Sequence, residues 1–376
     1  MTPDPAPRPS AATIGVLLGS VVVAAYTGIR MPSRWTATLQ TVSLQDGFHR
    51  RFLVGTLLRP IAQPTGYAYG LFVAVSFVVL AALVAVLVRV AVTTRIPARR
   101  LLIVAFLLLP TGGYLFHEVG YFDQLLYLMF FGSLWLLGRG RAVAAAAMLA
   151  LAVTVHEIAV LTVLPLFFLA ALRASPLRRA VLAVMPAALV GGVILVASAA
   201  VDGAGNRLGR RLTDTGFPLR PDALELFGRT QRDSWRLYSP SDVLLFLLPL
   251  FVIVVGAVFA LARTNARRSR RSAVPIVVWI AAAGAPVVLA AAGWDRERWA
   301  FLLIANFCVV VWFLLAEHPP EVGHSSHLVL VAALLLTAHV PLTYFDGYAP
   351  RALTADDISD FAERAASGSF TDTPPR

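Results

Sequence analysis

Residues 142–172 read AVAAAAMLALAVTVHEIAVLTVLPLFFLAAL, and this segment decides how the chain is arranged. It holds 31 residues, and its ionisable side chains form one dipeptide, His156-Glu157, near the centre. A membrane-spanning helix needs about 20 apolar residues. The segment is therefore either one long helix or two short helices that meet at the dipeptide, and the choice sets the side of the membrane on which every later loop lies.

Arginine-rich loops favour the two short helices. All 32 basic residues of the chain are arginine. With the N-terminus in the cytoplasm and two passes in 142–172, the arginine clusters at 89–100, 139–141, 173–179 and 263–271 all face the cytoplasm, as the positive-inside rule expects. A single pass would move the last two clusters outside. The sequence therefore predicts two passes.

Composition places the whole chain among membrane proteins. Of its 376 residues, 58% are apolar and 14% are charged, whereas soluble domains carry about 25% charged residues. The one cysteine excludes a disulfide within the chain. We predict an all-α polytopic fold of about 11 spans, because each run of sufficient length crosses the bilayer once. Besides the two passes in 142–172, the apolar runs are 12–29, 67–90, 101–116, 122–138, 180–200, 241–262, 274–293, 299–316 and 327–344.

The predicted domain organisation is simple. A cytoplasmic tail, 1–11, precedes one transmembrane domain, 12–344, with its largest outer loop at 201–240. A polar outer tail, 345–376, follows, and we expect it to be loosely ordered. Segment 48–60 is too short to span a bilayer and alternates arginine with apolar residues, which predicts a helix lying in the interface.

Charge and motifs exclude several functions. The net charge is +11, but no basic face with interleaved aromatic residues suggests nucleic-acid binding, and the positive-inside rule accounts for the excess. Neither His117 nor His156 begins an HExxH zinc helix, and no GxSxG elbow or phosphate-binding loop is present. The histidines of 318–327 are interpreted as a solvated loop. We predict no metal site and no resident cofactor, although a divalent metal stays possible.

Ionisable residues gather at the ends of the predicted spans. Such residues are costly near membrane depth, and their usual explanation is functional. Under the predicted topology they share the outer face, in five separate loops, with the centres of the spans almost free of charge. The candidate site residues are Asp46, Arg50, Arg51, His117, Glu118, Asp123, His156, Glu157, Asp295, Arg296 and Arg298.

Asp46 is the candidate general base. It lies in the sequence QDGFHRR, residues 45–51, where a carboxylate could deprotonate an acceptor hydroxyl. Arg50 and Arg51 follow and could hold a phosphate through paired hydrogen bonds. The structural alternative is a helix start, with Asp46 as its cap and both arginines on lipid headgroups.

The other clusters have structural alternatives too. Asp123 could simply cap the helix that follows it. His156-Glu157 could form a buried pair, since a charged dipeptide within an apolar segment must be paired or wet. The charges of 295–298 could form a local ladder of ion pairs between the flanking tryptophans, which suit a membrane interface.

An acidic residue in the first outer loop, followed by an interfacial segment, resembles the C-type (GT-C) membrane glycosyltransferases and the related bacterial polysaccharide-polymerase-like membrane proteins. Asp46 and segment 48–60 carry the resemblance, which covers the topology of residues 12–316. It implies a polyprenyl-phosphate sugar as donor, a glycan or lipid as acceptor, and a bacterial plasma membrane as location. No nucleotide-sugar-binding fold is then needed.

The leading hypothesis is an enzyme that transfers a sugar, with inversion, on the outer face. Asp46 acts as the base, and arginines stabilise the departing polyprenyl phosphate. The phosphate-binding candidates are Arg50, Arg51, Arg296 and Arg298. The candidates for binding sugar hydroxyls, or for a second acid or base, are His117, Glu118, Asp123, His156 and Glu157, with Asp295 nearby.

Two other classes of function stay open. A transporter or flippase of a lipid-linked glycan would bind the pyrophosphate in an arginine-lined cavity. It would also need charged residues continuous across the membrane, which the sequence does not show. A membrane acyltransferase would use His117 or His156 and would need an acyl-donor site reachable from the cytoplasm.

Overall fold

The computed structural model describes residues 10–48, 50–197, 204–215, 217, 219–225, 236, 241, 243–268, 274–291, 293, 295–317 and 350–367. In this part of the chain every regular element is a helix, which confirms the all-α class. The first half contains α1 (Ala11–Gly28), α2 (Arg34–Gln40), η1 (Leu44–Asp46), α3 (Phe52–Ala62), α4 (Tyr69–Thr93), α5 (Pro97–Leu108), α6 (Pro110–His117), α7 (Phe122–Gly138) and α8 (Ala142–Val155). The second half contains η2 (Glu157–Val160), α9 (Val163–Ala174), α10 (Leu177–Ala197), α11 (Ala204–Thr213), α12 (Pro221–Glu225), η3 (Val243–Leu247), α15 (Leu248–Arg268), α16 (Ile276–Gly284), η4 (Ala285–Ala291), α17 (Arg296–Glu317) and α19 (Ala355–Ala366).

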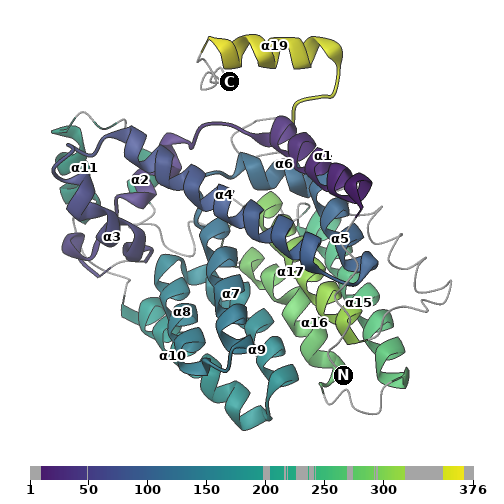
Figure 1. The fold of residues 1–376 in the computed structure, drawn as a ribbon. Coiled ribbons are helices and arrows are strands. Elements are labelled where there is room, and N and C mark those ends of the chain that lie inside the picture. The colour runs from purple at the N-terminus through teal and green to yellow at the C-terminus, as the bar shows by residue number, and fades with distance from the viewer. Residues whose placement is uncertain are drawn as a thin grey trace.

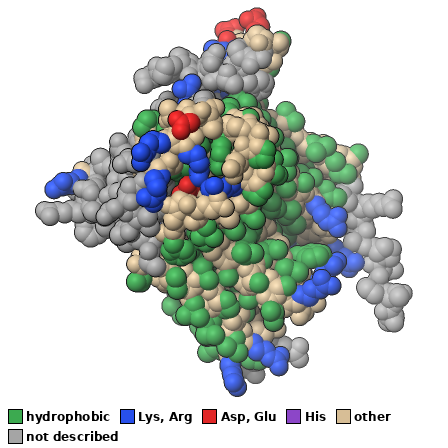
Figure 2. Space-filling view, turned by 90° about the vertical axis from the view of Figure 1, so that its left-hand side faces the viewer, with side chains coloured by type: hydrophobic (Ala, Val, Ile, Leu, Met, Phe, Trp, Pro, Cys, Tyr) green, Lys and Arg blue, Asp and Glu red, His purple; other side chains and the backbone are tan. Residues whose placement is uncertain are grey.

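Several of these helices are long and apolar enough to cross a membrane. Among the described residues there are six, or seven if the bent pair α5–α6 is one span. The expected count of about 11 is not confirmed, because α7, α8 and the α16–η4 segment are shorter apolar helices and run 327–344 lies outside the described residues. Large aliphatic side chains such as Val22, Leu189 and Leu245 are exposed, as a lipid-facing surface requires. Figure 2 shows this broad hydrophobic surface.

Two of the expected runs are broken helices. α5 and α6 meet at an angle of 64°. Leu109 between them has an extended backbone, with φ −76° and ψ 168°, because the residue before a proline is disfavoured in the helical region. The second break is at His156, where α8 ends after Val155 and the backbone is extended (φ −159°). Residues 142–172 therefore form two helices and not one.

The apolar helices stand side by side as a bundle. Figure 1 shows α7, α8, α9 and α10 next to α15, α16 and α17, with α4 crossing the bundle and α1 lying on α6. α1 and α6 approach closely where two glycines meet: a Cβ atom added to Gly28 would lie 1.7 Å from the Gly113 carbonyl oxygen. Backbones can come this near only where side chains are missing.

The first loop builds a small layer at one end of the bundle. α2, η1 and α3 follow α1, and α3 covers most of the segment predicted to be an interfacial helix. α11 packs against η1 and α12 packs against α2, so described parts of the 201–240 loop form helices over the first loop. Figure 1 shows α2, α3 and α11 together at this end.

Residues 350–367 of the predicted C-terminal tail include the helix α19 and contact the end of α1. Arg351 donates from its side chain to the carbonyl oxygens of Tyr26 and Ile29, at 2.9 and 2.7 Å. Its guanidinium also lies 4.7 Å from the Phe361 ring centre. α19 is therefore tied to the end of α1, because Arg351 satisfies carbonyl groups that the helix end leaves without partners.

Candidate functional site

A buried ion pair joins α7 to α17. Arg298 donates from Nε and Nη2 to the two carboxylate oxygens of Asp123, and both distances are 2.7 Å. Both side chains are nearly inaccessible to solvent, at 6% and 2% exposure. Asp123 thus does not act as a helix cap, since Tyr121 is the N-cap residue of α7. A two-bond arginine–carboxylate pair is the strongest geometry these groups can form.

His156 extends this pair toward α8. Its Nε2 lies 3.1 Å from Arg298 Nη2, and its Nδ1 lies 3.0 Å from Glu157 Oε2. Arginine only donates hydrogen bonds, so Nε2 must accept and the ring proton belongs on Nδ1, where it points to Glu157. The Ile158 amide lies 3.3 Å from the same Nδ1, a longer contact that competes with this arrangement. Arg298 therefore selects the tautomer of His156.

Glu157 connects the histidine to the first loop. Arg51 donates to both Glu157 oxygens, from Nη2 at 2.9 Å and from Nε at 3.3 Å. Arg50 lies 3.7 Å from the same carboxylate and is more exposed than Arg51. Arg51 holds its position in part through a left-handed backbone, with φ 65°, which is uncommon for a residue with a side chain. Polar contacts thus run from Asp123 through Arg298, His156 and Glu157 to Arg51, and we call these five residues the ion cluster.

Burial sets the charge of the histidine. His156 lies in the break between α8 and η2, outside the candidate spans, and burial lowers its pKa to about 4, with Arg51 and Arg298 acting in the same direction. Glu157 opposes this shift without cancelling it. His156 is therefore neutral near pH 7, in agreement with its role as an acceptor for Arg298.

Segment 295–298 belongs only partly to this cluster. Asp295 Oδ2 lies 3.8 Å from Arg298 Nη1. Burial raises the pKa of the Asp295 carboxyl, although Arg298 and Arg51 pull it down. Arg296 instead pairs with its neighbour Glu297 at 2.7 Å and is about a third exposed. The expected local ladder is therefore incomplete: Arg298 points away from it to Asp123, while Arg296 stays near the surface.

Asp46 lies in a second set of contacts. Ser43 donates to Asp46 Oδ2 from its amide at 3.0 Å and from its hydroxyl at 2.8 Å. Arg211 donates to Oδ1 at 2.6 Å and to Oδ2 at 3.2 Å, and Arg207 donates to the Asp46 carbonyl at 3.3 Å. The carboxylate is held in one orientation by a serine three residues before it and by an arginine 165 residues after it.

Arg211 is a site residue that sequence reasoning did not single out. It was one of many arginines in the 201–240 loop, and only the packing of α11 on η1 distinguishes it. The signal available in the sequence was the helical spacing of Arg207 and Arg211, four residues apart in AGNRLGRRLT. Residues at this spacing share one face of a helix.

The turn after α6 is buried and ties the first loop to α7. His117 and Glu118 are essentially inaccessible. Arg30 donates to the His117 carbonyl at 2.9 Å, and Gln40 donates to the Gly120 carbonyl at 2.7 Å. The Glu118 charge helps raise the pKa of Tyr121, though burial is the larger cause. Tyr121 in turn lies under the Arg298 guanidinium, at 5.3 Å. This turn therefore lies next to the ion cluster.

The structure brings most of the candidate residues to one end of the bundle. Seven of them belong to the ion cluster or touch it directly through Arg298 or Glu157. Asp46, held by Arg211, is connected to Arg50 and Arg51 along the first loop. His49, between Asp46 and Arg50, and Asp242, at the end of the 201–240 loop, lie outside the described residues. Figure 2 shows basic and acidic side chains gathered near the top of one face, above the hydrophobic surface. In the described residues no group of three or more His, Cys, Asp or Glu is placed to hold a metal ion.

Comparison with known proteins adds no further information: no family model, no curated protein and no solved structure matches the chain. The geometry is therefore the basis for assigning a function. It defines a multi-helix chain, compatible with a membrane protein of several passes, with a compact polar site at one end of an apolar bundle.

Proposed function

We propose that the chain is a membrane glycosyltransferase that moves a sugar from a polyprenyl-phosphate carrier to a glycan or lipid acceptor. The observation that carries the proposal is the convergence of acids and arginines from the first loop, α7, the α8–η2 break, α11 and α17 at one end of the bundle. Ionisable groups this close to apolar helices cost free energy, and such groups are usually present because they have a function.

The proposed location is a bacterial plasma membrane, with the polar site outside. Asp123 and Arg298 lie at the first turns of α7 and α17, and His156 follows the end of α8. Arg139, Arg141 and the 173–179 cluster lie at the opposite ends of α7, α8 and α9. The positive-inside rule assigns these opposite ends to the cytoplasm, which leaves the site on the outer face.

In the proposed reaction, an acceptor hydroxyl oxygen forms a bond to the anomeric carbon of the donor sugar. The hydroxyl proton passes to Asp46, and the bond from the anomeric carbon to the phosphate oxygen breaks with its electron pair on the phosphate. The configuration at the anomeric carbon is inverted, because the acceptor enters opposite the leaving group. Ser43 and Arg211 support Asp46 in this role by holding its carboxylate in one orientation.

Arg50 and Arg296 are the arginines that can meet the departing phosphate. They are the more exposed members of the site, at 42% and 38%. Arg298 is reassigned to a positioning role, because Asp123 and His156 take up its Nε and Nη2 donors and its side chain is buried. Through His156 and Glu157 it fixes Arg51, and so indirectly the turn that carries Arg50. Preorganised charge of this kind stabilises a developing phosphate charge without reorganisation during the reaction.

The test is transfer by the purified full chain in lipid nanodiscs, with a panel of radiolabelled polyprenyl-phosphate sugars and a lipid-extract acceptor. Asp46→Asn is expected to lower the transfer rate by about 100-fold or more, which is the usual effect of losing a general base. Asp360→Asn is the matched control, because Asp360 also pairs with an arginine, Arg364, but on the exposed face of α19.

Two outcomes would contradict the proposal. Full transfer by the folded Asp46→Asn variant would remove Asp46 as the base. In sealed vesicles, movement of intact labelled donor across the bilayer without any new glycosidic product would indicate a flippase. Transfer of an acyl group in the same preparation, lost on His156→Gln, would indicate an acyltransferase.

A further inference from the structure

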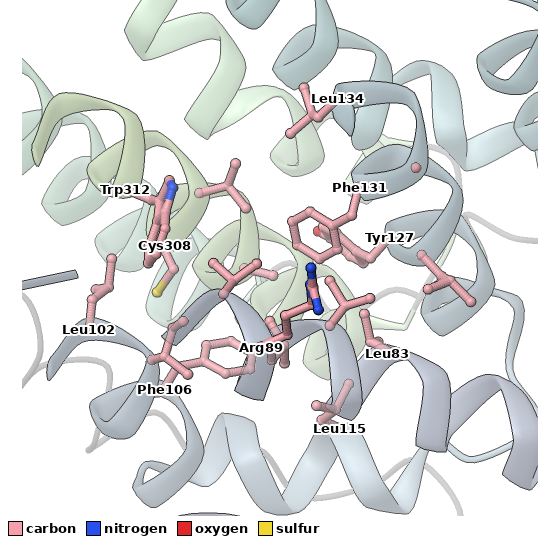
Figure 3. A pocket seen from close by; sticks show the side chains of 18 of the residues that line it. Leu83, Arg89, Leu102, Phe106, Leu115, Tyr127, Phe131, Leu134, Cys308 and Trp312 are labelled. Carbon is pink, nitrogen blue, oxygen red and sulfur yellow. The ribbon is translucent and has the colours of Figure 1, made fainter. Parts of the chain in front are cut away.

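A second feature of the bundle has no place in the proposed reaction. A cavity of about 510 Å³ lies between α4, α5, α7 and α17, which is a volume typical of small-molecule sites. Figure 3 shows its wall, in which aromatic and aliphatic side chains such as Leu102, Phe106 and Phe131 surround the space. The phenol of Tyr127, which also lines it, is engaged by Asn306 at 2.8 Å.

The cavity has one charged wall residue. Arg89, near the end of α4, is the sole charged residue among the described residues that line the cavity, and its side chain is exposed. Figure 3 shows Arg89 among the side chains that surround the space. None of the ion pairs among the described residues involves Arg89. An apolar space with a single cation at its edge matches a hydrocarbon chain that ends in an anionic group.

The depth of the cavity matches one leaflet of a bilayer. Along α17 the lining runs from Phe301 to Phe313, and twelve residues at about 1.5 Å per residue span about 18 Å. Half of a hydrocarbon core of about 30 Å is about 15 Å. The cavity therefore has the length of one acyl chain.

The charged end lies away from the candidate active site. Phe301 is one turn from Arg298, whereas Trp312 lies about 21 Å farther along α17 than Arg298 at about 1.5 Å per residue. Arginine–tryptophan pairs flank that far end: the Arg139 guanidinium is 4.0 Å from the Trp135 ring centre, and that of Arg99 is 4.5 Å from the Trp312 ring centre. Segments 89–100 and 139–141 hold six arginines and no acid. This end attracts a negative headgroup.

We propose that the cavity binds one acyl chain of an anionic phospholipid, with the lipid phosphate against Arg89. Gln40 donates to both Ser76 of α4 and the Gly120 carbonyl in the turn next to the ion cluster. Arg89 follows Ser76 by 13 residues, about 20 Å along α4, so a phosphate held there lies away from the proposed transfer. The site is therefore separate from the reaction and does not rest on the proposed function.

The experiment uses phosphatidylglycerol and phosphatidylcholine probes that carry a photoactivatable diazirine in the acyl chain. The full chain is reconstituted into vesicles with each probe, irradiated and digested, and cross-linked peptides are identified by mass spectrometry. We expect cross-links on α7 and α17 within 127–135 and 301–313, with the phosphatidylglycerol probe favoured.

Two variants separate the headgroup from the chain. Arg89→Gln is expected to weaken phosphatidylglycerol labelling about five-fold, which corresponds to about 1 kcal/mol for one cation near a membrane surface, and to leave phosphatidylcholine labelling unchanged. Arg141→Gln is the matched control, because Arg141 lies at the same end outside the cavity lining. Ala305→Phe fills the cavity and is expected to reduce labelling by both probes; Ala305→Leu serves if the larger side chain prevents folding.

Equal labelling of the parent chain and Arg89→Gln would overturn the headgroup assignment, and labelling unaffected by either Ala305 variant would overturn the cavity as the binding site. Suppression of labelling by polyprenyl phosphate but not by excess phosphatidylglycerol would overturn the proposal in favour of the donor lipid. These outcomes do not depend on transfer activity, so the failure of this proposal and of the proposed function are distinguishable.

Discussion

Arg298 and Asp123 lie 175 residues apart in the sequence, and each of the two Asp123 oxygens is 2.7 Å from an Arg298 nitrogen. This pair brings the first turn of α17 to the first turn of α7. It also supplies the hydrogen bond that selects the His156 tautomer. Together with the contact between Arg51 and Glu157, this long-range contact between two buried charges sets the arrangement of the ion cluster.

Removal of one partner of that pair should destabilise the fold strongly. Arg298→Met leaves the Asp123 carboxylate buried without its partner, and such losses cost about 3–5 kcal/mol. The double variant Arg298→Met with Asp123→Leu should recover much of that loss, because no unpaired charge remains. Unfolding midpoints in detergent, followed by tryptophan fluorescence, measure both effects.

Arg364→Gln is the control for this comparison. Arg364 and Asp360 form an exposed pair on α19, and exposed pairs contribute about 0–1 kcal/mol. A single Arg298 variant as stable as the Arg364 variant would show that the buried pair does not hold α7 to α17.

Arg211 should be required for transfer because it orients Asp46. Arg211→Lys keeps the charge but loses the paired contact with both carboxylate oxygens, since a lysine presents a point charge and not a planar fork. We expect a fall in kcat of about ten-fold for Arg211→Lys and a larger fall for Arg211→Gln, with KM for the donor little changed.

The control for Arg211→Lys is the same assay on Arg210→Lys, which alters the neighbouring arginine on α11. A rise in KM with unchanged kcat for Arg211→Lys would mean that Arg211 binds substrate and does not position the base.

Gly28→Ala should disrupt the contact between α1 and α6. The added Cβ would lie 1.7 Å from the Gly113 carbonyl oxygen, so one backbone must move away. We expect poor folding yield and an unfolding midpoint lowered by several degrees, because overpacking typically costs about 1–3 kcal/mol or more. Size-exclusion chromatography and thermal unfolding report both.

Gly19→Ala is the matched control on the same helix, since a Cβ there meets no atom within 4 Å. Equal behaviour of the two alanine variants would show that α1 and α6 are farther apart than the structure places them.

Acid should destabilise the fold in part through His156. The pKa of this residue is about 4 in the folded chain and 6.5 for an unperturbed histidine. Between these values the unfolded chain binds a proton that the folded chain does not, so the free energy of unfolding falls as the pH falls from 6.5 toward 4. The slope from this one group is at most about 1.4 kcal/mol per pH unit.

The measurement is the difference in unfolding midpoint between the parent chain and His156→Gln from pH 4 to pH 8. Arg51, Arg298 and Glu157 surround the ring in the parent chain and remain in the variant, so subtraction isolates the histidine. A difference that does not change with pH below 6.5 would contradict the depressed pKa.

The helical class, the positions of most described helices and the break at His156 could be predicted from the sequence alone. Hydropathy and chain length settle these features locally, since a long apolar run must satisfy its own backbone as a helix. The bend between α5 and α6 was not predicted, because run 101–116 was interpreted as one span. The sequence also located most candidate site residues, because a charge at the end of an apolar run is conspicuous wherever it falls.

The pairing of the charges follows from the packing of the helices and could not be predicted from the sequence. The sequence left Arg298 as a phosphate ligand and Arg211 as one of many loop arginines, whereas packing gives Arg298 to Asp123 and Arg211 to Asp46. The contact between Arg351 and the end of α1 could not be predicted from the local sequence pattern either. The physical reason is that a side chain's hydropathy depends on its own chemistry, while the partner of a buried charge depends on which helices lie beside it, and residues far apart in the chain set that arrangement.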